Sequence, residues 1–178
     1  MTGTALVLGG TRSGKSTFAE SLLAGAPRVS YVATSEVRPD DAEWVERLRI
    51  HRSRRPSHWE TVETIDLAAE LRRDDITPML VDCLGVWLTR LLDDGCWDRD
   101  PAALEQLGIR VEEFLSALRK TRRPVVFVSN EVGLGVVPAT SAGRLFTDQL
   151  GRLNMQVAAT VDRVWFCVAG IPMQVKGT

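Results

Sequence analysis

Short apolar runs alternate along the chain with longer segments of helical periodicity. The apolar runs have the length of β-strands, are bounded by turn residues, and cover residues 5–8, 29–34, 79–82, 124–129 and 163–168. Apolar residues recur with helical spacing over residues 16–23, about 41–52, 65–73, 84–92, 101–120 and 141–161. This alternation predicts an α/β fold with a mostly parallel central sheet flanked by helices.

Local signals refine several element boundaries. Gly25 is a suitable end for the first helix, and Asp100 is placed to cap the long helix that starts at Pro101. We predict a loop over residues 136–140 and a short edge strand in the C-terminal segment PMQVKGT, because a proline at a strand's start costs no ladder hydrogen bond. Without repeats, low-complexity segments or long linkers, residues 1–178 are predicted to form a single domain.

Composition narrows the class of protein. Of the 178 residues, 44% are hydrophobic and 25% are charged, which suits one globular core. The formal net charge of −1 gives no overall attraction to nucleic acids or acidic membranes, so we expect neither as a partner. The three cysteines have no metal-ligand or disulfide spacing. Since the chain has neither a leader-like N-terminus nor a run of about 18 apolar residues, we expect a soluble cytoplasmic protein without a membrane span.

A phosphate-binding motif follows the first predicted strand. The segment GGTRSGKS matches GxxxxGK[ST] and consists of Gly9, Gly10, Thr11, Arg12, Ser13, Gly14, Lys15 and Ser16. Glycines let the backbone wrap around phosphate, and the N–H groups and dipole of the next helix favour an anion. Lys15 would reach the β- and γ-phosphates as the catalytic cation, and the Ser16 hydroxyl would bind Mg²⁺. The alternative is a glycine-rich turn with an exposed lysine.

Two carboxylates follow predicted strands. Asp82 ends an apolar strand, where the metal-linked acid of a P-loop protein lies; the alternative is that Asp82 caps the next helix. Glu131 follows another strand and could face the same crevice or lie in a solvated loop.

The chain lacks the signatures of some P-loop classes. A guanine-reading switch GTPase would carry an Asn-Lys-x-Asp element, and the segment SNEV at residues 129–132 is not one. Nothing resembles a motor domain with added helicase elements. Small-molecule phosphoryl or nucleotidyl transfer is therefore the leading class.

A histidine surrounded by arginines is the second candidate for chemistry. His51 shares a helical stripe with Trp44 and Leu48, and arginines stand at positions 47, 49, 52, 54 and 55. The simpler interpretation is a packed structural histidine beside a solvated helix end. The functional alternative is that neutral imidazole attacks an α-phosphorus while the arginines neutralise phosphate charge. His58 is less favoured, because its setting is typical of the entry to a short strand.

Several motifs together resemble a known family. The segments GGTRSGKS, YVATS, HRSRRPSHWETVE, LVDCLGVWLTRLL, VSNEVGLGVVP and VWFCVAGIPMQVK occur in the order and spacing of the bifunctional adenosylcobinamide kinase/adenosylcobinamide-phosphate guanylyltransferase family of cobalamin biosynthesis. The resemblance covers nearly the whole chain. It implies that ATP or GTP phosphorylates adenosylcobinamide and that GMP then passes from GTP to adenosylcobinamide phosphate through a guanylylated histidine.

The resemblance also implies site residues and an assembly. It assigns the guanylylated histidine to His51, and it assigns nucleotide contacts to the motif at residues 9–16 and to Ala33, Thr34, Ser35, Arg52, Ser53, Arg54, Arg55, Glu63 and Asp82. Some relatives have Glu where this chain has Asp82, which leaves direct or water-mediated metal contact open. A RecA-like P-loop NTPase fold and a homotrimer are further implications. A P-loop kinase without covalent histidine chemistry and a nucleotide-dependent regulatory module are the competing hypotheses.

Overall fold

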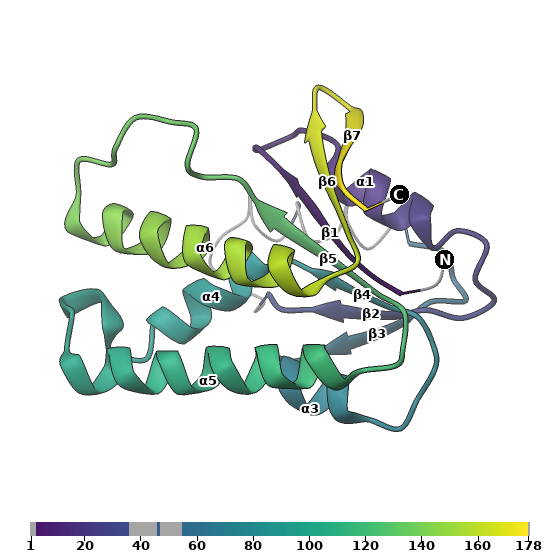
Figure 1. The fold of residues 1–178 in the computed structure, drawn as a ribbon, viewed down its shortest axis with the longest axis horizontal. Helices are drawn as coiled ribbons and strands as arrows, with labels where there is room; N and C mark the ends of the chain where they lie inside the picture. Colours follow the sequence, from purple (N-terminus) through teal and green to yellow (C-terminus); the bar gives the residue numbers. More distant parts are fainter. Residues whose placement is uncertain (1–2, 36–45, 47–54, 178) are drawn as a thin grey trace.

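The computed structural model describes residues 3–35, 46 and 55–177. Within them, seven strands form one sheet in the order β3-β2-β4-β5-β1-β6-β7 (Figure 1). The strands are β1 (Thr4–Gly9), β2 (Ser30–Ala33), β3 (Glu60–Glu63), β4 (Met79–Asp82), β5 (Val125–Asn130), β6 (Arg163–Val168) and β7 (Ile171–Lys176). Every neighbouring pair is parallel except β6 and β7, which form an antiparallel hairpin at the edge. The predicted α/β class with a mostly parallel sheet is confirmed.

Helices connect the strands as the periodicity predicts. The helices are α1 (Lys15–Leu22), α3 (Leu67–Arg72), α4 (Leu84–Leu92), α5 (Pro101–Lys120) and α6 (Ser141–Thr160), and a 3-10 turn, η1, covers Cys96–Asp98. The predicted N-cap of α5 is confirmed, because the Asp100 carboxylate accepts a hydrogen bond of 2.8 Å from the Ala103 amide. The helix predicted over residues 41–52 lies outside the described residues, apart from the helical residue 46.

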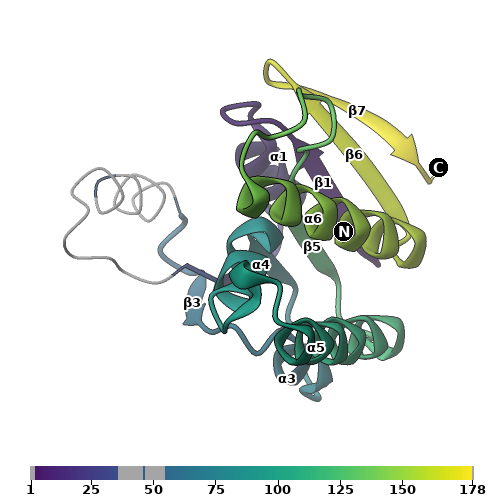
Figure 2. The ribbon, with the colours of Figure 1, turned by 90° about the vertical axis from the view of Figure 1, so that its left-hand side faces the viewer.

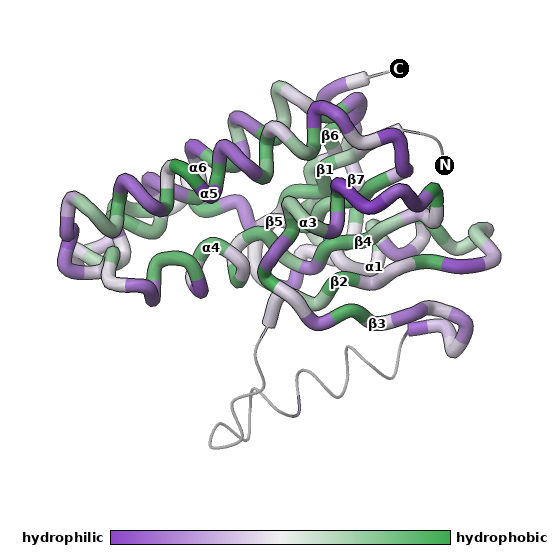
Figure 3. The backbone as a smooth tube through the Cα atoms, turned by 90° about the horizontal axis from the view of Figure 1, so that it is seen from below, coloured by the Kyte–Doolittle hydropathy of each residue, from purple (hydrophilic) through white to green (hydrophobic). Residues whose placement is uncertain are grey.

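Successive residues of the central strands point to opposite faces of the sheet, and each face has its own helices. On one face, Ala19 and Leu23, from α1 and the residue after it, pack with Val7 and Val126. On the other face, α3, α4, α5 and α6 cover Leu6 and their other buried strand partners (Figures 1 and 2). Hydrophobic stretches follow the central strands, whereas the long helices alternate between hydrophobic and hydrophilic positions (Figure 3). The central strands are therefore buried on both faces of the sheet, as is typical of a parallel sheet.

The edges of the sheet differ from its centre. β3 was not among the predicted apolar runs, because only Val62 of its four residues is partly buried and the other three are exposed. It begins two residues after His58, which agrees with the short strand expected there. β7 confirms the predicted C-terminal edge strand, and its proline is the second residue of the strand, Pro172.

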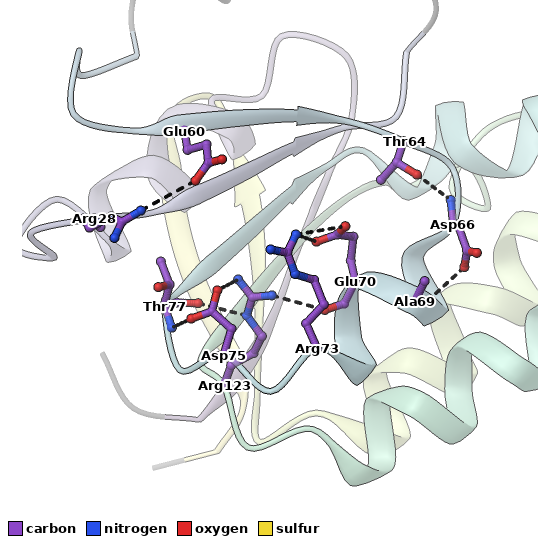
Figure 4. A network of polar contacts seen from close by, with 10 residues as sticks. All are labelled: Arg28, Glu60, Thr64, Asp66, Ala69, Glu70, Arg73, Asp75, Thr77 and Arg123. Carbon is purple, nitrogen blue, oxygen red and sulfur yellow. Dashed lines mark hydrogen bonds and ion pairs between the residues drawn. The ribbon is translucent and has the colours of Figure 1, made fainter.

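A buried arginine anchors the amino-terminal ends of β4 and β5. Arg123 is 2% exposed; its Nε donates to the carbonyl of Thr77 at 2.9 Å, and its Nη1 donates to the carbonyl of Glu70 at 3.2 Å (Figure 4). Its Nη2 lies 3.7 Å from the Asp75 carboxylate. Burial lowers the pKa of Arg123, and the charges of the nearby acids oppose that effect. The network is structural, because it lies at the end of the sheet opposite the carboxyl ends of the strands.

No helix within the described residues has both the length and the apolar character needed to cross a bilayer.

Candidate active site

The carboxyl ends of the parallel strands bring the predicted site residues to one edge of the sheet. Gly9 ends β1 and pairs with Asn130 at the end of β5, and Ala33 at the end of β2 pairs with both Asp82 and Glu63. These residues are far apart in sequence, and the shared register alone places them in a row. In open α/β sheets, ligands bind in the crevice outside these strand ends.

The loop between β1 and α1 closes directly onto the helix start. The Ser13 amide donates to the Gly10 carbonyl at 3.3 Å, and the Phe18 amide donates to the Gly14 carbonyl at 3.0 Å as the first helical bond. Gly14 is the N-cap of α1 and has no side chain that could accept a hydrogen bond from the first amides of the helix. Amides of this kind, together with the helix dipole, form a site that favours an anion.

Two positions in this loop require glycine for different reasons. Gly14 has φ of 87°, and a Cβ there would lie 3.0 Å from the Cα of Gly170 in the β6–β7 turn. The two segments are tied at this point, because the Gly170 amide donates to the Ser13 carbonyl at 2.9 Å. A Cβ on Gly9 would lie 2.7 Å from the carbonyl oxygen of Cys167 in β6. The loop is therefore seated tightly on the strand next to β1.

A Cβ on Gly10, in contrast, would meet no atom within 4 Å. Thr11 and Arg12 are exposed, and Ser13 is 7% exposed. Lys15 and Ser16 are partly buried at the start of α1. The loop thus has an open side at Gly10, which a phosphate group can approach closely.

Lys15 reaches back over the loop. Its ammonium group donates to the Gly10 carbonyl at 3.1 Å. Burial and the charge of Asp82 raise the pKa of Cys83 to about 11, and the charge of Lys15 opposes that rise. Lys15 therefore acts electrostatically on the end of β4, although β5 lies between β1 and β4 in the sheet.

Asp82 is held by a tyrosine that the sequence did not single out. The Tyr31 hydroxyl, on β2, donates to Oδ2 of Asp82 at 2.8 Å. Burial first, and the charge of Asp82 second, raise the pKa of Tyr31 well above its ordinary value. The N-cap of α4 is Cys83 and not Asp82, so the capping alternative is wrong. A buried tyrosine hydroxyl needs a partner, and this rule was the one signal in the sequence that could have pointed to Tyr31.

The segment after β2 lies at the carboxyl edge of the sheet and also stabilises the fold. Thr34 is fully buried; its hydroxyl donates to the Cys83 carbonyl at 2.9 Å and accepts from the Cys83 amide at 3.1 Å. The Thr34 carbonyl accepts from Arg90 at 3.4 Å. Ala33 is 6% exposed and Ser35 is partly exposed. These hydrogen bonds of the Thr34 side chain tie the end of β2 to the end of β4.

The remaining predicted residues divide between described and undescribed positions. Arg55 is partly buried, and its guanidinium lies 3.5 Å from the ring centroid of Tyr31. Glu63 is exposed at the end of β3. His51, Arg52, Ser53 and Arg54 lie outside the described residues.

Glu131 lies at the same edge but bonds to its own loop. Its amide donates to the Gly9 carbonyl at 3.1 Å, and its carboxylate accepts a short hydrogen bond from the Gly133 amide. Among the described residues, no three His, Cys, Asp or Glu side chains gather in a cluster that could hold a metal ion. A divalent ion at this edge would depend on few protein ligands, which is the usual arrangement for Mg²⁺ on a nucleotide.

Comparison with known proteins shows the family. The model of the family described as cobinamide kinase / cobinamide phosphate guanyltransferase matches residues 5–175. The chain belongs to this family. Its members phosphorylate cobinamide and transfer a guanylyl group to cobinamide phosphate, so the chain is an enzyme with these two activities. The predicted RecA-like P-loop NTPase class agrees with the β1-loop-α1 unit and with the sheet order.

Curated relatives extend over almost the whole chain. The bifunctional adenosylcobalamin biosynthesis protein CobP of Pseudomonas aeruginosa is 44% identical over 176 residues, covering 97% of this chain and 96% of that protein. The bifunctional adenosylcobalamin biosynthesis protein CobU of Escherichia coli K12 is 40% identical over 180 residues, covering 96% and 98% respectively. A solved structure from Pyrococcus horikoshii OT3 matches with a TM-score of 0.50 at 11% identity, covering 98% of this chain and 86% of that one, and supports the fold alone.

Proposed function

We propose that the enzyme acts on adenosylcobinamide and its phosphate in cobalamin biosynthesis, with the loop at residues 9–16 binding the polyphosphate of ATP or GTP. The observation that carries this proposal is the start of α1, where the helix dipole and first amides beyond the glycine N-cap, the open side at Gly10 and the Lys15 ammonium converge. Together they provide a positive, close-fitting site for a polyphosphate. Relatives named for adenosylcobalamin biosynthesis support the choice of substrate.

Mg²⁺ is the proposed cofactor, held by the Ser16 hydroxyl and the Asp82 carboxylate. The donor set fits this ion, because Mg²⁺ prefers oxygen ligands and usually takes one or two protein groups, with phosphate oxygens and water completing its shell. Bound there, it would neutralise charge on the phosphate oxygens. Asp82 has the hydrogen-bonded, partly buried setting that keeps a carboxylate oriented.

In the kinase step, the hydroxyl of adenosylcobinamide attacks the γ-phosphorus of the nucleotide. The bond between that phosphorus and the β–γ bridging oxygen breaks, and the nucleoside diphosphate leaves. Lys15 stabilises the charge that spreads over the β- and γ-phosphate oxygens, and the loop amides hold the β-phosphate in place. The rigid seat of the loop on β6 keeps these donors aimed before the substrate binds.

In the guanylyl transfer, a neutral nitrogen of His51 attacks the α-phosphorus of GTP, and pyrophosphate leaves. The resulting phosphoramidate is then attacked by a phosphate oxygen of adenosylcobinamide phosphate, which releases the imidazole and yields adenosylcobinamide-GDP. Arg52, Ser53, Arg54 and Arg55 contact the phosphates in this proposal, and the arginines neutralise their charge. Ala33, Thr34, Ser35 and Glu63 complete the nucleotide contacts.

Incubation with GTP labelled at the α-phosphorus, followed by denaturing electrophoresis, tests the covalent step. We expect an acid-labile, alkali-stable label on the chain, lost in His51→Ala and kept in His58→Ala, the matched control at the second of its two histidines. A label that persists in His51→Ala would contradict the assignment. No label on the wild-type chain, with retained phosphorylation of adenosylcobinamide, would instead support a P-loop kinase without covalent histidine chemistry.

The assembly and compartment are part of the proposal. We propose a cytoplasmic homotrimer that needs no nucleic acid. Leu134, Val136 and Val137 support an interface, since all three are at least 75% exposed on the loop after β5. The three cysteines are free thiols, as in a reducing compartment. Light scattering should give three times the 19.7 kDa of one chain, and a monomer mass would contradict the trimer.

A further inference from the structure

A chain of side-chain contacts runs across the sheet edge to Asp82. On β3, the Thr61 hydroxyl accepts a hydrogen bond of 3.1 Å from Nη1 of Arg55. The Arg55 guanidinium lies over the Tyr31 ring on β2, 3.5 Å from its centroid. The Tyr31 hydroxyl donates to Asp82 on β4 at 2.8 Å. Three neighbouring strands therefore meet through one aromatic side chain.

Tyr31 is built to hold a fixed position. It is 1% exposed and packs beside Trp59, with ring centroids 6.5 Å apart. An ionised carboxylate can only accept hydrogen bonds, so the Tyr31 hydroxyl is the donor of the 2.8 Å bond to Asp82. A carboxylate at a strand end can otherwise turn about its side-chain torsions, and this bond fixes one of its two oxygens.

Arg55 adds both position and charge to this arrangement. A guanidinium stacked on an aromatic face is attracted to the ring, and more strongly where water is excluded. Its charge acts against the rise in the pKa of Tyr31. Arg55 is also the last of the clustered arginines at positions 52, 54 and 55 that follow His51 in sequence.

We propose that Tyr31 is a positioning residue that orients Asp82 for the Mg²⁺-nucleotide, and that Arg55, braced by Thr61, holds Tyr31 in place. This inference rests on the proposed role of Asp82 in holding Mg²⁺. Arg55 and the strand-end carboxylate of Asp82 are thereby coupled through Tyr31. Groups that orient a metal-ligating side chain typically change metal affinity or activity about 10–100-fold when removed.

The positioning role of Tyr31 can be measured without enzyme turnover, by comparing nucleotide binding in the presence and absence of Mg²⁺. Calorimetric titration with AMP-PNP gives one Kd in MgCl2 and one in EDTA, and their ratio reports the gain in affinity from Mg²⁺. In Tyr31→Phe, which keeps the ring and removes the hydroxyl, we expect that gain to fall about 10-fold or more. The Kd in EDTA should stay within about twofold of wild type, since the loop at residues 9–16 is untouched.

Two further variants keep the test sharp. Thr61→Val removes the acceptor that braces Arg55 at an exposed position, and should reduce the gain in the same direction by a smaller factor. Phe114→Leu lowers stability through the core on the opposite face of the sheet, and should leave the gain unchanged.

The outcomes separate this inference from the function it rests on. A wild-type gain retained in Tyr31→Phe would overturn the positioning role. A loss of gain in Phe114→Leu equal to that in Tyr31→Phe would also overturn it, because lower stability of the fold would then be enough to explain the loss of Mg²⁺-dependent affinity. If Asp82→Asn keeps the full gain, or wild type shows none, the proposed metal site itself fails and the positioning role fails with it.

Discussion

Replacing the buried Arg123 by methionine should cost the protein about 3 kcal/mol of unfolding free energy. Two hydrogen bonds from the guanidinium to backbone carbonyls would be lost, and bonds with a charged donor contribute about 1.5–3 kcal/mol each. Methionine also relieves the desolvation of a buried charge, which reduces the net loss. Asp75 can regain water once its partner is gone, because its side chain is already 33% exposed. These opposing effects place the estimate near the lower end of the 3–5 kcal/mol range known for breaking buried pairs, about 3 kcal/mol.

Urea unfolding at pH 7 measures this loss. We expect a lower midpoint with an unchanged slope, and a fall in Tm of about 6–12 °C at this chain length. Arg122→Met is the matched control, because it removes the same charge from the adjacent, exposed position and should change stability by less than about 0.5 kcal/mol. Equal effects of the two substitutions, or a loss under about 1 kcal/mol in Arg123→Met, would refute the view that Arg123 anchors the amino-terminal ends of β4 and β5.

Three other substitutions each test the role of one side chain. Lys15→Ala should lower kinase turnover about 10²–10³-fold with Tm nearly unchanged, and turnover at the wild-type rate would contradict the phosphate-binding role. Lys176→Met removes an ammonium that donates to three carbonyls at the end of α6, the shortest bond being 2.6 Å; thermal melting should show a clear loss of stability, and an unchanged Tm would argue against this cap. Hydrogen bonds from Thr4 lower the pKa of Asp162, so their contribution to stability is complete above the ordinary carboxyl pKa and is lost as the pH falls through the lowered folded value. In acid titrations monitored by circular dichroism, Asp162→Asn should accordingly flatten the pH dependence below about pH 4, and a curve parallel to wild type would exclude this contribution.

The parts of the fold that were predictable depend on local physics. The strand, glycine loop and helix over residues 4–22 were predictable from the sequence, because apolar runs, glycines and helical periodicity act over a few residues. The helix cap at Asp100 was predictable for the same reason. β3 was only hinted at, because an exposed edge strand lacks the apolar run that marks a central strand.

The candidate site was predictable as a set of segments but not as a set of contacts. Asp82 was identified from its place at the end of a strand, yet its partner Tyr31 is 51 residues away in sequence. Thr34 was predicted in a nucleotide-contact segment, but the hydrogen bonds of its hydroxyl to both backbone groups of Cys83 could not be predicted from the sequence. Resemblance to a family supplied the proposed chemistry of His51, whereas periodicity alone placed this residue only on an inward-facing helical stripe.

Residue order and periodicity thus predict most of the strands and helices, and they predict a phosphate site in the loop at residues 9–16. The sheet order and register settle which distant groups meet: Tyr31 with Asp82, Thr34 with the Cys83 backbone, and the β6–β7 turn with the loop. The physical reason is one of range. Backbone preferences and capping act within a few residues, whereas contacts across parallel strands exist only once hydrophobic burial has chosen one packing of the whole sheet.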